Sequence, residues 1–124
     1  MIEDIYKEQI LEHYKEPRNF GKLENANHHA REVNPLCGDN VELFLNVKDG
    51  RIVDVSFNGD GCAISKASCS MLTEKLKGMK IEDARKITSN DILKMLGIDI
   101  SPVRIKCALL SLKVLGSAIN QNNT

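Results

Sequence analysis

Two stretches in the first half of the chain alternate apolar and polar residues, a pattern typical of strands with one buried face. The apolar positions are Val41, Leu43, Leu45 and Val47 in the first stretch, and Val53, Val55 and Phe57 in the second. Asp49-Gly50 lies between the two stretches and suits a type I′ turn, in which both central residues have φ > 0. The pattern therefore predicts a β-hairpin, and residues 28–33 are a candidate third strand.

Apolar residues at three- and four-residue spacing predict helices in the rest of the chain. Residues 2–15 form an amphipathic stretch that Pro17 ends, and an Asn- and Gly-rich loop follows over residues 18–27. A second helix should run from Cys62 until Gly78 closes it. His13 should lie on the surface of the first helix, and His28 and His29 should point to opposite faces of a strand, so we expect no metal ligand among the histidines.

Two further helices are marked by their ends. Thr88 or Ser89 can cap a short helix that runs through Leu96 to Gly97. Ser101 and Pro102 suit the N-cap and first position of a last helix. Its predicted apolar stripe consists of Val103, Cys107, Leu110, Val114 and Ala118.

These elements predict an α+β fold: a small antiparallel sheet of about three strands, built on the central hairpin and covered by helices on one face. An N-terminal helix and a long C-terminal helix flank this arrangement. We expect residues 1–124 to form a single domain, in which the polar tail at 120–124 is frayed.

Charge excludes some classes of partner. Lys and Arg number 17, as do Asp and Glu, so no basic excess points to nucleic acid. Apolar runs are short and the chain begins with an acidic amphipathic stretch, so we expect no membrane span or signal peptide and a cytoplasmic protein. Cytoplasmic thiols stay reduced, and the four cysteines therefore indicate metal binding or catalysis before disulfides.

Three cysteines lie at predicted segment boundaries: Cys37 just before the hairpin, Cys62 after it, and Cys107 in the second turn of the last helix. Near a helix start, the thiolate of Cys62 should form more readily than that of an ordinary cysteine. A tight turn with a buried, inert thiol explains Cys62 alone equally well. If the last helix packs over that end of the sheet, however, the three thiols converge and Asp39 can add a carboxylate. Such a set could hold zinc or offer iron three thiolates and one weaker ligand.

With these motifs in this order, and with Tyr14-x-x-Pro17-Arg18-Asn19-x-Gly21 near the start, the chain resembles the IscU, SufU and NifU N-terminal family of iron–sulfur cluster assembly scaffolds. The resemblance implies that Cys37, Cys62 and Cys107 bind a cluster or zinc, that Asp39 is the labile fourth ligand, and that Lys106 flanks the last cysteine. It also implies a cysteine desulfurase that supplies persulfide sulfur, a 2Fe-2S cluster built with iron, and transfer of that cluster to apo iron–sulfur proteins.

Two departures bear on the subfamily. IscU proteins have His at the position of Lys106, whereas SufU proteins share the Lys. However, the 44 residues between Cys62 and Cys107 leave no room for the insertion typical of SufU proteins. Residues 99–104 retain only the Pro-Val-basic core of the IscU chaperone motif, which makes a dedicated chaperone partner doubtful. A zinc-dependent sulfurtransferase with Cys107 as sulfur acceptor is therefore the alternative function, and a structural zinc domain is a third.

The remaining candidates have supporting or packing roles. Cys69 is on the same predicted helix as Cys62, about 10 Å along its axis, so we expect packing and no shared metal. Gly38 and Gly61 each adjoin a proposed ligand and could give a partner's sulfur-carrying loop room to enter. Lys106 is either a solvated helix residue or a contact for persulfide or cluster. A cluster with incomplete ligation could also be shared in a homodimer.

Overall fold

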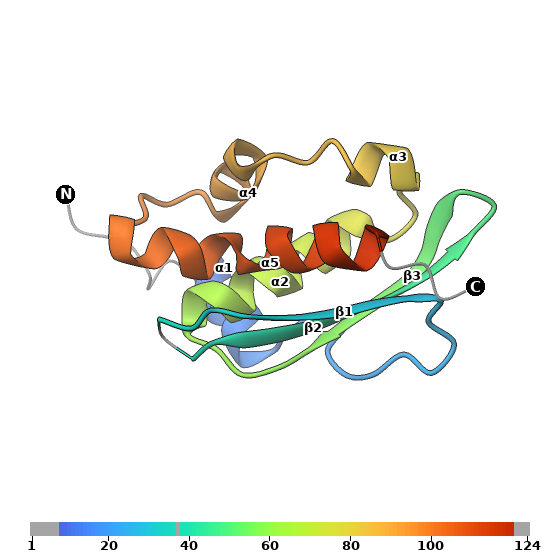
Figure 1. Cartoon of the computed structure of the whole chain (residues 1–124). Coiled ribbons are helices and arrows are strands. Elements are labelled where there is room, and N and C mark those ends of the chain that lie inside the picture. The colour runs from blue at the N-terminus through green and yellow to red at the C-terminus, as the bar shows by residue number, and fades with distance from the viewer. Residues whose placement is uncertain (1–7, 37, 121–124) are drawn as a thin grey trace.

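The computed structural model describes residues 8–36 and 38–120 (Figure 1). Its elements, in chain order, are α1 (Glu8–Lys15), β1 (His28–Val33), β2 (Asn40–Lys48), β3 (Arg51–Asn58), α2 (Ala63–Leu76), α3 (Ile81–Ala84), α4 (Ser89–Leu96) and α5 (Pro102–Asn120). The strands form one antiparallel sheet in the order β1-β2-β3. α5 packs on β1 and β2, and α2 packs on β3 and α5. The predicted α+β fold is confirmed.

The hairpin forms as predicted, with one correction. Asp49 and Gly50 have φ values of 53° and 77°, as a type I′ turn requires. A bulge between Asn46 and Val47 then shifts the register, so that Val47 pairs with Ile52. Ile52 is fully buried, whereas Val53 is 42% exposed. The prediction that Val53 shares a buried face with Val55 was therefore wrong, because the extra residue in the bulge reverses the alternation.

Capping residues in the sequence predicted most of the helix ends. Thr88 and Asp91 form a capping box at the start of α4, and Gly97 ends that helix with a φ of 68°. The four-residue α3 was not predicted, since it is too short to show a helical period. α5 continues through Asn120, so the first residue of the predicted tail is helical. Residues 2–7 of the first predicted helix and 121–124 of the predicted tail lie outside the described residues.

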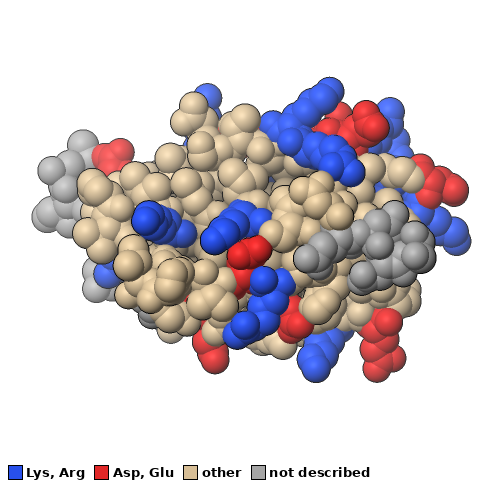
Figure 2. Space-filling view, viewed as in Figure 1, with Lys and Arg blue, Asp and Glu red and all other residues tan. Residues whose placement is uncertain are grey.

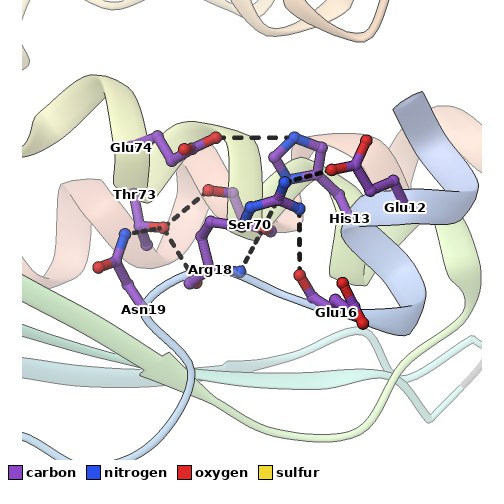
Figure 3. Close-up of polar contacts among 8 residues, drawn as sticks. All are labelled: Glu12, His13, Glu16, Arg18, Asn19, Ser70, Thr73 and Glu74. Carbon is purple, nitrogen blue, oxygen red and sulfur yellow. Dashed lines mark hydrogen bonds and ion pairs between the residues drawn. The ribbon is translucent and has the colours of Figure 1, made fainter.

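α1 is tied to α2 by a polar network that includes His13 (Figure 3). Nδ1 of His13 lies 2.7 Å from the hydroxyl of Ser70, and the backbone N–H of Arg18 donates to the same oxygen at 2.8 Å. The His13 side chain is only 12% exposed, and burial lowers its pKa. The expectation of a surface histidine was wrong, because His13 packs against Ser70 and Glu74 of α2.

The other two histidines lie on opposite faces of the sheet, as predicted. His28 is buried, and its Nδ1 lies 3.0 Å from the carbonyl oxygen of Ala118 on α5. His29 stacks on Phe44 and lies 2.6 Å from Glu42. Among the described residues, no helix is long and apolar enough to cross a membrane.

Candidate metal centre

Three segments meet at the end of the sheet where α5 begins, at the left of Figure 1. The turn between β1 and β2 is closed by hydrogen bonds of 2.8 Å from the Asn34 N–H to the Asp39 carbonyl and from the Gly38 N–H to the Asn34 carbonyl. The Asn40 N–H then donates to the Asp60 carbonyl, also at 2.8 Å. This bond holds the turn against the loop between β3 and α2, so Asp39 and Cys62 approach each other although 22 residues separate them.

Asp39, Cys62 and Cys107 come together at this junction. One carboxylate oxygen and the two sulfur atoms all lie within 4.8 Å of one another. Asp39 and Cys107 are 8% and 7% exposed, while Cys62 is more open. Cys37, the other predicted ligand, lies outside the described residues, between Leu36 and Gly38 in the sequence.

Cys62 is the N-cap of α2, as its place between strand and helix predicted. Its Sγ accepts a hydrogen bond from the Ser65 N–H at 3.5 Å. Its own N–H donates to Asp39 at 3.4 Å, a long contact. Backbone N–H groups at the start of α2 thus contact both the Cys62 sulfur and the Asp39 carboxylate.

Gly61 permits this close approach. A Cβ at this position would lie 3.0 Å from the Ser65 hydroxyl and 3.4 Å from Cγ of Asp39. Gly38 has a φ of 78° and open space where a side chain would be. The first glycine thus allows packing within the site, whereas the second leaves space beside it.

Cys107 reaches the site because α5 is fixed against α2. The buried hydroxyl of Ser68 on α2 donates to the carbonyl of Ala108 at 2.8 Å and lies 2.8 Å from the hydroxyl of Ser111. Asn34 Nδ2 lies 4.0 Å from the sulfur of Cys107, a distance typical of a weak contact to sulfur. These contacts join the Cys107 segment to both of the other segments.

The three candidate ligand residues, Asp39, Cys62 and Cys107, line a cleft of about 590 Å³. The start of α5 supplies much of its wall, through Pro102, Val103, Arg104 and Lys106, and Leu36 also lines it. Leu36 is 77% and Val103 85% exposed, so placing Val103 in the buried stripe of the last helix was wrong. In Figure 2 this half of the molecule carries few charged side chains, and Lys and Arg side chains stand among residues of other kinds. The cleft wall therefore combines apolar and basic side chains.

The sequence analysis did not single out Asn34 as a residue of the cleft, although its place in a turn is a local sequence signal. The Asn34 side chain accepts a hydrogen bond from the Leu36 N–H at 3.1 Å and so shapes the turn. An Asn two residues before a turn position is typical of this Asx arrangement. Arg104, which also lines the cleft, had no such signal.

Cys69 does not belong to the cluster found among the described residues. It is 2% exposed within the apolar core, and burial raises the pKa of its thiol well above the usual range. The predicted packing position is confirmed. Two thiols and a carboxylate are three donors that suit zinc or iron, since thiolates prefer these softer ions and a carboxylate oxygen can join either shell.

Comparison with known proteins assigns the chain to a family. Residues 5–124 match the family model of the NifU-like N-terminal domain, and the chain belongs to this family. The iron–sulfur cluster assembly scaffold protein IscU 1 of Archaeoglobus fulgidus is 38% identical, with 93% of this chain and 74% of that protein covered. The zinc-dependent sulfurtransferase SufU of Bacillus subtilis is 37% identical, with 95% and 91% covered. The predicted resemblance to this group is thereby confirmed.

A solved structure supports both fold and family. The protein of Fervidobacterium islandicum assigned to iron–sulfur cluster assembly in the SUF system superimposes with a TM-score of 0.80 and 34% identity, covering 93% of this chain and 96% of that one. The alignment with the Bacillus protein spans 135 positions, more than the 124 residues of this chain. That relative therefore carries residues that this chain lacks.

Proposed function

We propose that this protein is a scaffold on which a 2Fe-2S cluster is assembled from iron and persulfide sulfur and then passed to apo iron–sulfur proteins. The observation that carries the proposal is the approach of Asp39, Cys62 and Cys107 to within 4.8 Å at an open cleft. We include Cys37 in the ligand set, on the basis of its place in the sequence between Leu36 and Gly38. Relatives named as scaffolds, such as IscU 1, support this assignment.

The proposed partner that supplies sulfur is a cysteine desulfurase. A thiolate of the site attacks the outer sulfur of the desulfurase persulfide, the S–S bond breaks, and the desulfurase cysteine leaves as a thiolate. Conversion of each transferred sulfur to sulfide takes two electrons from an external thiol reductant. The open space at Gly38 provides room for the sulfur-carrying segment, and exposed Lys106 in the cleft wall places a positive charge where anionic sulfur arrives.

Asp39 is proposed as the exchangeable ligand. A carboxylate is a harder and weaker partner for iron in a cluster than a thiolate, so its bond to the cargo is the first to open. The N-terminus of α2 lies beside Asp39 and can stabilise the negative charge of the released carboxylate. Cys62 and Cys107 retain the cargo meanwhile, because soft thiolates dominate the binding.

A second candidate is a zinc-dependent sulfurtransferase, which the similarity to SufU favours. Asp39, Cys62 and Cys107, with Cys37, would hold zinc, which would lower the charge on the bound thiolates and keep them from oxidation. In this function Cys107 is the proposed sulfur acceptor. The same desulfurase would then be the partner, and no cluster would form.

Three wider proposals accompany this function. We propose that the whole of residues 1–124 acts as one scaffold domain, because its described elements share one core. We propose a cytoplasmic location, since accessible thiolates need a reducing compartment. A homodimer is proposed only for the cluster-loaded form, in which a second copy can complete the ligation.

Anaerobic reconstitution with iron, cysteine and a cysteine desulfurase tests the proposal. The scaffold predicts visible cluster absorption with about two irons per cluster, strongly reduced in Cys62→Ser and Cys107→Ser. Cys69→Ser is the matched control and should load like the parent, because its thiol lies in the apolar core. Tightly retained zinc with a persulfide on Cys107, and no cluster bands, would instead establish the sulfurtransferase.

A further inference from the structure

Two buried hydroxyl groups in the described part of the chain have no hydrogen-bond partner: those of Ser56 and Ser65. Ser56 is on β3, in register with Phe44 and away from the residues that line the cleft. Ser65 is 1% exposed and lies in the first turn of α2, three residues after Cys62. A buried hydroxyl without a partner is unfavourable by an amount comparable to a lost hydrogen bond. We therefore expect the Ser65 hydroxyl to form a hydrogen bond in another conformation of the site.

The Asp39 carboxylate is an acceptor that lies across a small gap from Ser65. The Ser65 hydroxyl and the Asp39 carboxylate carbon border the same small gap, since a Cβ on Gly61 would lie 3.0 Å from one and 3.4 Å from the other. The gap exists because residue 61 is glycine. A rotation of the Asp39 side chain into it brings the carboxylate towards the Ser65 hydroxyl.

The N-terminus of α2 offers Asp39 a second donor at the same place. The Cys62 N–H already contacts the carboxylate, but at a long 3.4 Å. The same movement can shorten this contact while the hydroxyl of Ser65 donates to the other oxygen. The helix macrodipole stabilises a carboxylate at this position.

We propose that Ser65 is a positioning residue that holds the Asp39 carboxylate on the N-terminus of α2 when Asp39 leaves the bound metal ion. Asp39 thus has two positions: one directed to the ion beside Cys62 and Cys107, and one directed to Ser65. Ser65 stabilises the second position and so speeds release. The inference rests on the proposed function only in that the site binds a metal ion during its cycle.

A merely structural Ser65 makes the opposite prediction. Removal of an unpartnered buried hydroxyl should then leave metal release unchanged and stability equal or slightly higher. If Ser65 receives Asp39, its removal destabilises the state from which the ion departs and slows departure. The expected size is about tenfold, as for the loss of one hydrogen bond to a charged group.

The test is the dissociation rate of Co²⁺ from the full chain, followed in stopped flow by the loss of the sulfur-to-cobalt absorption after addition of excess chelator. We expect Ser65→Ala to release Co²⁺ about tenfold more slowly than the parent. Ser56→Ala, which removes the other unpartnered buried hydroxyl, should release it at the parent rate. In an Asp39→Ala background, Ser65→Ala should have no effect, because the carboxylate that it receives is gone.

The outcomes separate this inference from the proposed function. If the parent binds Co²⁺ through sulfur and Ser65→Ala releases it as fast as the parent or faster, the role of Ser65 is overturned while the metal site stands. An equal slowing by Ser65→Ala with and without Asp39 also overturns it, because the effect would not act through the carboxylate. A parent chain that binds no Co²⁺ through sulfur overturns the metal site, and this inference with it.

Discussion

Gly59 offers a sharp test of how the site is built. Its φ is 136°, and a Cβ there would lie 2.2 Å from the carbonyl oxygen of Asn40, whereas real Cβ contacts stay above 3.0 Å. Asn40 follows the proposed ligand Asp39 in the chain, and its N–H is bonded to Asp60. Gly59→Ala must therefore push apart the two segments that carry Asp39 and Cys62.

Gly21 is the matched control, because it has a similar φ of 131° and nothing within 4 Å of a Cβ. Both alanine variants carry backbone strain of about 1–3 kcal/mol. Gly59→Ala adds a steric overlap of about 1–3 kcal/mol. We expect losses in the free energy of unfolding of about 2–6 kcal/mol for Gly59→Ala and about 1–3 kcal/mol for Gly21→Ala.

Urea denaturation followed by circular dichroism measures these losses, and Co²⁺ titration of the folded variants measures the site. Gly59→Ala should weaken Co²⁺ binding as well as stability, whereas Gly21→Ala should leave binding unchanged. A Gly59→Ala protein that is no less stable than Gly21→Ala and binds Co²⁺ like the parent would refute the reasoning. The contact between Gly59 and Asn40 would then not set the geometry of the site.

Three further predictions follow from single groups. Burial lowers the pKa of His13, so its contribution to stability is complete above its unfolded pKa of about 6.5 and is lost as pH falls towards the folded value. In urea denaturation, the free energy of unfolding should therefore fall less steeply between pH 7 and 5 in His13→Gln than in the parent. An equal slope in the two proteins would contradict this. The thiol of Cys69 is buried and its pKa is raised, so it should resist a thiol reagent at pH 8 in the native protein and react after unfolding. Mass spectrometry measures the two rates, and equal rates in the native and unfolded protein would show that Cys69 is accessible. Thr88→Ala removes the capping hydrogen bond of α4 and should cost about 1 kcal/mol in thermal unfolding; no loss would mean that the cap contributes nothing.

Local patterns in the sequence predicted most of the fold. The Asp49-Gly50 turn, the cap at Thr88 and the ends of α4 depend on residues close together in the chain, so their signals are visible without tertiary structure. The burial of Ile52 in place of Val53 depends on a bulge, which alternation alone does not show. Helical spacing likewise did not show the exposure of Val103, because the first turn of α5 borders the cleft and not the core.

The candidate site was predicted less directly. Cysteines at segment boundaries suggested that Cys62 and Cys107 converge, and the structure brings them together with Asp39. The contacts that make this possible join distant parts of the chain, such as Ser68 on α2 with Ala108 on α5. Neither residue stood out in the sequence, because a hydrogen bond from a side chain on one helix to the backbone of another has no local pattern.

Cluster transfer is the most direct test of the central claim that this site builds and releases a 2Fe-2S cluster. The chain is loaded anaerobically, mixed with an apo-ferredoxin in the presence of an iron chelator, and followed by circular dichroism of the acceptor. We predict that the parent transfers an intact cluster, and that Asp39→Ala still acquires one but transfers it more slowly, because it lacks the exchangeable ligand. An acceptor that gains no cluster signal would contradict the scaffold, and transfer from Asp39→Ala at the parent rate or faster would contradict the role of Asp39.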